Sequence, residues 1–362
     1  MKACCGSSRR GLKIGCVVLA LQFPLWAKCC VGAETEYVRE ILFETRAHEE
    51  PLNLPIGLGF PSPWGKPSNL IEGHTSLLIF EVDNEGEVVY VDPSDGTVAI
   101  FNISENRYRR FSPVVEDFIW PRTFCVGPND EIYITMSREM KDPDEHKSKL
   151  VRYIRNGAEY LLDNNFKIGI ADWPMHVASI SMDSTIYIDT YDSVSSFSHM
   201  YGVVDYYGQF IRRSKALAKI GSNTEVYVNP GRSGQAGTVE GVDVNTNASI
   251  FDFHLDLRFH RFLINTPDSS FALLQFKYRN TAYKEDLKLQ NFKPVVYIYD
   301  YKSGTITKIL TEECGRDDFK YFNVSGVCAS PKGDIYALVV YYNTPGEITG
   351  DEKIVLYRWR EK

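Results

Sequence analysis

Three polar residues stand at corresponding places in the sequence, and their side chains suit a hard cation. Asp92, Asp189 and Asn229 each come two residues after the Tyr of a short β-branched phrase. Carboxylate and amide oxygens are the ligands that Ca²⁺ takes, about six to eight at a time. Each of these residues would equally begin a turn by hydrogen bonding to its own backbone. The pattern thus offers a divalent-cation site, with Asp189 as the candidate ligand, and ordinary turns as the alternative.

His176 is a fourth candidate, because it falls on a strand that we expect to lie near the centre of the fold. A histidine facing the centre would act as a metal ligand or a base, and a structural, hydrogen-bonded histidine is the alternative. The sequence has no Gly-x-Ser-x-Gly elbow, His-Glu-x-x-His motif, P-loop or Rossmann fingerprint. Catalytic residues therefore stay unassigned, and whether the protein is an enzyme stays open.

Composition excludes several classes of protein. The chain has 362 residues, of which 44% are hydrophobic and 24% charged, as in ordinary globular proteins. Forty basic residues against 47 acidic ones give a net charge of −7. A nucleic-acid-binding protein needs basic patches to neutralise phosphates, so nucleic acid is not an expected partner.

Residues 1–33 have the layout of a secretory signal peptide. Basic residues precede an apolar stretch over 14–27, and Val31-Gly32-Ala33 supplies small residues before a cleavage point. A membrane anchor is the alternative, although the apolar stretch is short for a span and contains Pro24. Cleavage would leave no transmembrane span and a net charge of −12, since five basic residues and no acidic ones would leave. We expect an exported protein, which is periplasmic, cell-surface or secreted.

Three cysteines remain after cleavage, namely Cys125, Cys314 and Cys328. An exported location permits a disulfide. Cys314 and Cys328 are close in sequence and are the better pair, while two buried thiols are the alternative.

A repeated phrase gives the strongest indication of the fold. A turn residue, a β-branched residue, Tyr and an apolar residue recur around Tyr90, Tyr133, Tyr187, Tyr227 and Tyr336, with a weaker copy around Ala272. The spacing of 40–64 residues, built from short strands, is typical of propeller blades. Each copy extends into four strands, and no long amphipathic helix interrupts the series. The sequence therefore predicts an all-β, six-bladed β-propeller over residues 34–362.

The chain ends predict how the ring closes. The last copy has three strands, ending with 353–359, and 37–46 reads as a strand without a nearby turn partner. Pairing these two segments would complete the sixth four-stranded blade and remove an open edge. Residues 47–75 are rich in Pro and Gly and predict an irregular lead-in.

The propeller arrangement would place the four candidate residues at one rim. The connection after each second strand opens on one face, which brings Asp92, Asp189 and Asn229 to that face, with His176 nearby. Long loops on one face often carry function. The longest expected loops are 137–148, 229–238 and 277–293.

The segment Val82-Asp83-Asn84-Glu85-Gly86-Glu87-Val88-Val89-Tyr90-Val91-Asp92 resembles a blade of the NHL-repeat propellers. It is also similar to the gluconolactonase-like and streptogramin-lyase-type propellers. The resemblance implies a six-bladed fold. Lactonases of this architecture hold a divalent cation with Glu, Asn and Asp, and Asp189 matches the Asp that ends a second strand there. The chain departs from them at Glu72-Gly73-His74, which is displaced, and it lacks their Asn-Asp-Gly segment, since Asn129-Asp130 opens a strand instead.

Two functional hypotheses follow. The first is an exported binding module that holds a small ligand or a protein through one face, favoured by the lack of a catalytic constellation. The alternative is a metal-dependent hydrolase or lactonase that uses a central carboxylate, and a carbohydrate-active lyase is a third reading. Propeller folds serve many functions, so the fold does not decide between them. Three segments also fit the glycosylation pattern Asn-x-Ser, beginning at Asn102, Asn247 and Asn323.

Overall fold

The repeated phrase forms the same tight hairpin in several places. In the first copy the N–H of Asp83 donates to the carbonyl of Glu87 at 3.1 Å, and Gly86 lies in the left-handed region with φ 82°. A three-residue loop that ends in a left-handed residue is a common hairpin connection. The corresponding hairpins place Asp130, Ser184 and Gly333 at the same left-handed position. Asn129-Asp130 therefore lies in a turn, not at the beginning of a strand as the sequence had suggested.

The computed structural model describes residues 36–362 except for the following: 47–79, 92–95, 114, 117, 139–147, 169–173, 191–199, 230–236, 256–257, 266–269, 277–293, 301–303, 311–313 and 344–351. The predicted signal peptide, the Pro/Gly-rich lead-in and Asp92 therefore lie outside the described residues. The described residues belong to one compact unit, Thr35–Lys362.

The described residues form six antiparallel sheets of four strands each. The first contains β2 (Phe80–Val82), β3 (Val88–Val91), β4 (Val98–Asn102) and β5 (Arg107–Phe111). The second contains β6 (Phe118–Val126), β7 (Ile132–Arg138), β8 (Ser148–Asn156) and β9 (Glu159–Leu162). The third contains β10 (Pro174–Ile180), β11 (Ile186–Thr190), β12 (Tyr201–Val204) and β13 (Phe210–Ser214).

The remaining sheets continue the series. The fourth contains β14 (Ala218–Ile220), β15 (Thr224–Asn229), β16 (Gly237–Asp243) and β17 (Ser249–Leu255). The fifth contains β18 (Arg258–Asn265), β19 (Ser270–Phe276), β20 (Pro294–Asp300) and β21 (Thr305–Leu310). The sixth contains β22 (Tyr321–Ala329), β23 (Ile335–Tyr342), β24 (Lys353–Glu361) and, from the other end of the chain, β1 (Tyr37–Arg46).

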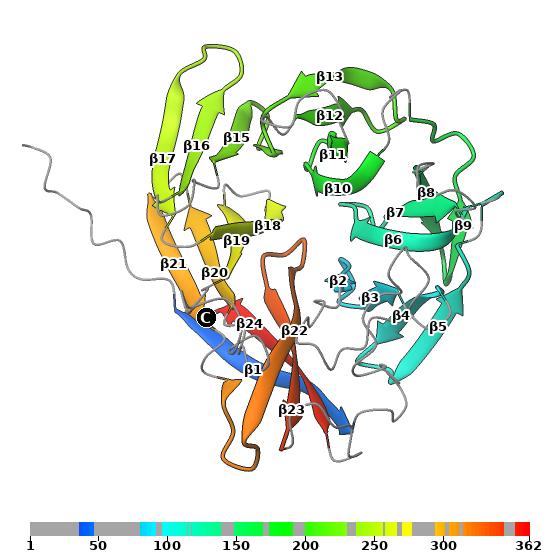
Figure 1. The fold of residues 1–362 in the computed structure, drawn as a ribbon, viewed down its shortest axis with the longest axis vertical. Helices are drawn as coiled ribbons and strands as arrows, with labels where there is room; N and C mark the ends of the chain where they lie inside the picture. Colours follow the sequence, from blue (N-terminus) through cyan, green and yellow to red (C-terminus); the bar gives the residue numbers. More distant parts are fainter. Residues whose placement is uncertain are drawn as a thin grey trace, which may run out of the picture. The chain divides into compact units, whose positions relative to one another are not determined.

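The first strands of the sheets lie innermost and contact one another in a closed series. The contacts run from β2 to β6, β10, β14, β18 and β22, and β22 returns to β2. Figure 1 shows β2, β6, β10, β18 and β22 around the centre, with later strands further out. The protein is thus an all-β propeller whose blades are four-stranded antiparallel sheets.

The predicted pairing of the two chain ends is confirmed. Strand β1 pairs antiparallel with β24, from Tyr37 opposite Glu361 to Arg46 opposite Lys353. Glu44 accepts from Lys353 at 2.7 Å and from Arg316 at 2.7 Å, and Glu40 pairs with Arg358. These contacts hold the N-terminal strand on the sixth sheet.

The tyrosines of the repeated phrase pack between sheets. Tyr90 lies in a cluster with Phe80 of its own sheet and Tyr336 and Leu338 of the sixth sheet. Aromatic side chains supply large buried areas at such contacts. The Tyr of the first repeated phrase is thus buried between two sheets.

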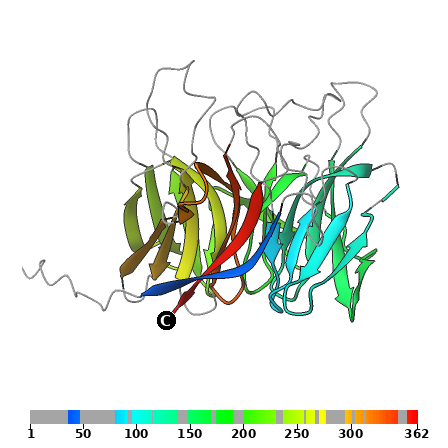
Figure 2. The same ribbon diagram turned by 90° about the horizontal axis from the view of Figure 1, so that it is seen from below.

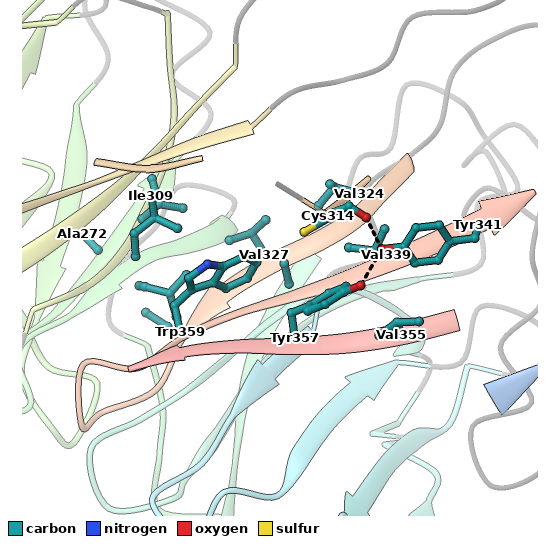
Figure 3. Packing of buried hydrophobic residues seen from close by; sticks show 14 residues of the cluster. Ala272, Ile309, Cys314, Val324, Val327, Val339, Tyr341, Val355, Tyr357 and Trp359 are labelled. Atoms are coloured by element: carbon teal, nitrogen blue, oxygen red, sulfur yellow. Dashed lines mark hydrogen bonds between the residues drawn. The ribbon is translucent and has the colours of Figure 1, made fainter. Parts of the chain in front are cut away.

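The sixth sheet contains a buried polar contact within its apolar cluster (Figure 3). The hydroxyl of Tyr341 donates to the carbonyl of Cys314 and shares a hydrogen bond of 2.6 Å with the hydroxyl of Tyr357. Cys314 and Cys328 are both buried thiols and are not joined by a disulfide. Of the two readings of these cysteines, the structure supports buried thiols.

Within the described residues, no helix is long and apolar enough to cross a membrane.

Candidate functional site

The strands of the six sheets are joined at two opposite edges of the ring, and the two edges differ in structure. We call the edge where each first strand turns into the second, and each third into the fourth, the hairpin edge. We call the opposite edge, where each second strand leads to the third, the connection edge. Figure 2, a side view, shows the short turns of the β2–β5 sheet pointing to the hairpin edge.

Two of the predicted site residues lie at corresponding places on the connection edge. Asp189 is the penultimate residue of β11, and Asn229 is the last residue of β15. The two sheets are neighbours, since β10 contacts β14. Asp92 follows β3 directly in the sequence but lies outside the described residues. Of the three predicted rim residues that follow a repeated Tyr, the structure therefore describes only Asp189 and Asn229.

His176 lies beside Asp189 in the third sheet. The Cα atoms of His176 on β10 and Asp189 on β11 are partners in the antiparallel register, and Asp189 faces Tyr201 of β12 on its other side. Irregularities of register interrupt β10 on both sides of His176, but they also occur in β6, β18 and β22. Because such irregularities recur in several sheets, they are not a signature of this histidine.

The carboxylate of Asp189 acts on its neighbour. Burial, aided by this negative charge, raises the pKa of Tyr201 to about 12. Asp189 is half-buried, whereas Asn229 is exposed at the end of its strand. The described part of the chain contains no group of three or more His, Cys, Asp or Glu that could hold a metal ion. The residues in view provide single oxygen ligands at this edge rather than a complete cation site.

The hairpin edge carries a network of charged residues that the sequence analysis did not single out. Arg155 of β8 reaches the first sheet, where its guanidinium lies 3.0 Å from Asp83, 2.6 Å from Glu85 and 3.1 Å from Glu87. In return, Asn84 donates to the carboxylate of Asp130 at 2.9 Å and to the carbonyl of Pro128 at 2.8 Å. These contacts join the first and second sheets.

Asp83 is the buried centre of this network. Its carboxylate accepts from the backbone N–H groups of Glu85 at 3.0 Å and Glu87 at 2.8 Å. Burial raises the pKa of Asp83 to about 6; the carboxylates of Asp130 and Glu87 act in the same direction, while the Glu87 N–H and Arg155 oppose it. Asp83 thus fixes the turn and holds Arg155.

Arg152 joins the second and third sheets. Its guanidinium forms an ion pair with Asp163, both side chains being buried, and donates to the carbonyl of Tyr206. It also lies over aromatic rings, 4.0 Å from the centroid of Tyr206 and 4.8 Å from that of Phe166. Cation–π contacts of this kind are stronger where water is excluded.

The third and fourth sheets are joined in the same way. The buried carboxylate of Glu225 accepts from the hydroxyls of Tyr187 and Tyr227, each at 3.0 Å, and pairs with Arg212. Lys219 donates to Asp183 at 2.6 Å. Ion pairs and hydrogen bonds of charged side chains thus join the first four sheets in succession at the hairpin edge.

The sequence does contain a signal for this network. An acidic residue stands directly before the β-branched residues of several repeated phrases, with one such residue before Tyr after Glu131, Glu225 and Asp334 and two after Glu87. The three glutamates are buried. Because buried carboxylates need partners, this position indicates polar contacts at the hairpin edge.

Comparisons with known proteins do not assign the chain to a family. No protein-family model matches the chain, and no curated protein matches it. A solved structure of a streptogramin B lyase is 9% identical, with 90% of this chain and 98% of that chain covered and a TM-score of 0.39. A putative TolB from Agrobacterium tumefaciens is 11% identical, covering 79% and 91%, with a TM-score of 0.43. An oligogalacturonate lyase in complex with manganese is 12% identical, covering 76% and 74%, with a TM-score of 0.41.

Proposed function

We propose that the protein is an exported, six-bladed β-propeller that binds a small ligand or a partner protein through its connection edge. Each of the six sheets serves as one blade, and β1 completes the sixth. Asp92, Asp189, Asn229 and His176 belong to the proposed binding rim. The signal-peptide layout of residues 1–33 supports export to the periplasm, the cell surface or the medium.

The contrast between the two edges is the observation that carries this proposal. The hairpin edge is built from short turns, such as 83–87, 127–131 and 181–185, whose charges pair between sheets. The connections at the other edge are longer and unequal, from 92–97 to 277–293. Variation in length and sequence on a fixed scaffold is how loops acquire binding specificity.

A pair of substitutions on the same sheet tests the assignment of the edge. Asn229→Lys changes the connection edge, where Asn229 faces Thr238. Asp243→Lys changes the hairpin edge of the same strand pair, where Asp243 faces Thr224. The immobilised full chain is incubated with proteins from the medium of its source cells, and retained proteins are identified by mass spectrometry. We expect Asn229→Lys to weaken retention at least tenfold and Asp243→Lys to leave it within twofold. The opposite result, or equal effects, would refute the proposal.

The alternative, a metal-dependent hydrolase or lactonase, is favoured by the adjacency of His176 and Asp189 in the sheet. The divalent-cation content of the purified protein, measured in the presence of calcium, separates the two functions. A stoichiometric cation that is lost in Asp189→Asn would favour the enzyme. Retention of no cation would favour the binding module.

A further inference from the structure

The three Asn-x-Ser segments lie in different structural settings. The bulky oligosaccharide of an N-linked glycan needs an acceptor whose side-chain nitrogen is accessible at the surface. Sequence alone treats Asn102, Asn247 and Asn323 as equals. The structure separates them.

Asn247 lies at the tip of the hairpin between β16 and β17. Its backbone is left-handed, with φ 57°, and its N–H donates to the carbonyl of Asp243 at 2.8 Å. The carboxylate of Asp243 fixes the turn by accepting from the N–H groups of Asn245 at 3.0 Å and Thr246 at 2.8 Å. The turn is therefore held without the side-chain amide of Asn247.

The whole acceptor segment is exposed. Residues 244–250 are all exposed, and these include Ser249, whose hydroxyl completes the pattern. The side chain of Asn247 has no hydrogen bond within the described part of the chain. A glycan on its nitrogen would displace no contact in view.

Asn102 is in the opposite situation. Its side-chain nitrogen, the atom that a glycan would occupy, donates to the buried carboxylate of Glu87 at 3.2 Å. Its side-chain oxygen accepts from the Ser104 hydroxyl at 2.8 Å and the Glu105 N–H at 3.0 Å. Modification of Asn102 would therefore disturb the hairpin-edge network around Glu87.

Asn323 is placed inside a sheet. It belongs to β22, the innermost strand of the sixth sheet, where its Cα faces that of Val340. The next residue, Val324, is buried in the apolar cluster between sheets. The acceptor segment of Asn323 thus lies within a paired strand, whereas that of Asn247 lies in a turn.

We propose that Asn247 is an N-glycosylation site, and that Asn102 and Asn323 are not. The inference rests on the proposed export and applies where that export follows a eukaryotic secretory route. The donor is an oligosaccharide linked through diphosphate to a lipid. The side-chain nitrogen of Asn247 forms a bond to the anomeric carbon of the first sugar and loses one proton, and the sugar–oxygen bond breaks to release the lipid diphosphate.

The site also fits the proposed binding face. The N–H of Val244 donates to the carbonyl of Asn223 at 2.8 Å, which places the Asn247 hairpin beside the β14–β15 turn at the hairpin edge. A glycan there would leave the connection edge uncovered. It would also lie at the start of β17, the outermost strand of its sheet, where a bulky group opposes edge-to-edge pairing.

The test uses the full chain expressed in eukaryotic cells in two forms, one with its own N-terminus and one preceded by an established cleavable signal peptide. Ser249→Ala removes the hydroxyl of the acceptor pattern, Asn247→Gln removes the acceptor, and Ser104→Ala and Ser325→Ala are the matched controls. A glycosidase that converts a glycosylated Asn to Asp marks each occupied site for mass spectrometry.

We expect the form with the added signal peptide to carry one glycan, at Asn247. The mass shift should disappear in Ser249→Ala and Asn247→Gln and persist in both controls. An unmodified Asn247 in secreted protein, or occupancy of Asn102 or Asn323, would overturn the inference. The form with the added signal peptide could be glycosylated at Asn247 while the form with its own N-terminus stays in the cell without a glycan. That result would refute the proposed export and leave the assignment of Asn247 intact.

Discussion

The hairpin edge and the connection edge of the propeller are made by the same strands, yet they differ in what their side chains do. At the hairpin edge, Asp83, Arg152 and Glu225 have their polar atoms occupied by partners from a neighbouring sheet. At the connection edge, Asp189 and Asn229 end their strands half-buried and exposed. The difference teaches that these charges of the hairpin edge join neighbouring sheets, and our proposal assigns recognition to the longer connections of the other edge.

The largest expected effect comes from breaking the buried ion pair between Arg152 of β8 and Asp163, which directly follows β9 of the same sheet. The same arginine donates to the carbonyl of Tyr206 in the third sheet. Arg152→Ala leaves the carboxylate of Asp163 buried without its partner, and we expect a loss of about 3–5 kcal/mol in the free energy of unfolding. Urea denaturation measures it. Arg107→Ala removes an exposed pair with Glu105 and serves as the control, with an expected loss of about 0–1 kcal/mol. Equal losses would show that the hairpin edge is not held by its buried charges.

A smaller effect is expected between the third and fourth sheets. Tyr187→Phe removes the hydroxyl that donates to the buried Glu225 while keeping the ring, and we expect a loss of about 2 kcal/mol in unfolding free energy. The matched control is Tyr207→Phe, on an exposed ring, which should change stability by about 0.5 kcal/mol or less. No difference between the two variants would contradict the role of Glu225 in joining sheets.

The smallest expected effect depends on pH. Burial acts to raise the pKa of Asp183, but hydrogen bonds from Lys219, Ser181 and Thr185 outweigh it and lower the pKa to about 2. Because the ordinary value is 3.8, the stabilisation is complete above about pH 4 and is lost as the pH falls through 2. Asp183 is partly exposed, so Asp183→Asn should cost only about 0.5–1 kcal/mol at pH 6.

Thermal unfolding between pH 2 and pH 6 checks this expectation. The difference between Asp183→Asn and the natural chain should shrink as the pH approaches 2. Asp252→Asn, at an exposed residue on β17, provides the control. A difference that stays constant across this range would remove Asp183 from the charge network of the hairpin edge.

Much of the fold could be predicted from the sequence because the repeated phrase is local. A residue able to adopt positive φ, followed by β-branched and aromatic residues, determines a hairpin within a few residues, as at Gly86 and Gly333. The strand at 37–46 could be placed because it had no partner nearby and the last blade needed a strand. Strand boundaries were less accurate: the last strand, expected over 353–359, extends to Glu361.

The candidate site was only partly predictable. The spacing of the phrase predicted Asp189 and Asn229 near the ends of second strands, and they lie at the ends of β11 and β15. Their part in binding stays a prediction. The spacing could not reveal that Arg155 meets Asp83 across sheets, because the two residues are distant in the sequence.

The sequence by itself determined the hairpins, the blade-like repeat and the strand that completes the last sheet, since each depends on local backbone preference or on the need to cover an open edge. Only the tertiary structure decided which charged residues form ion pairs, which cysteines remain thiols and which Asn-x-Ser segment is exposed. The physical reason is that these properties belong to contacts between sheets. Burial and ion pairing arise where residues from different blades meet, and no local pattern specifies that meeting.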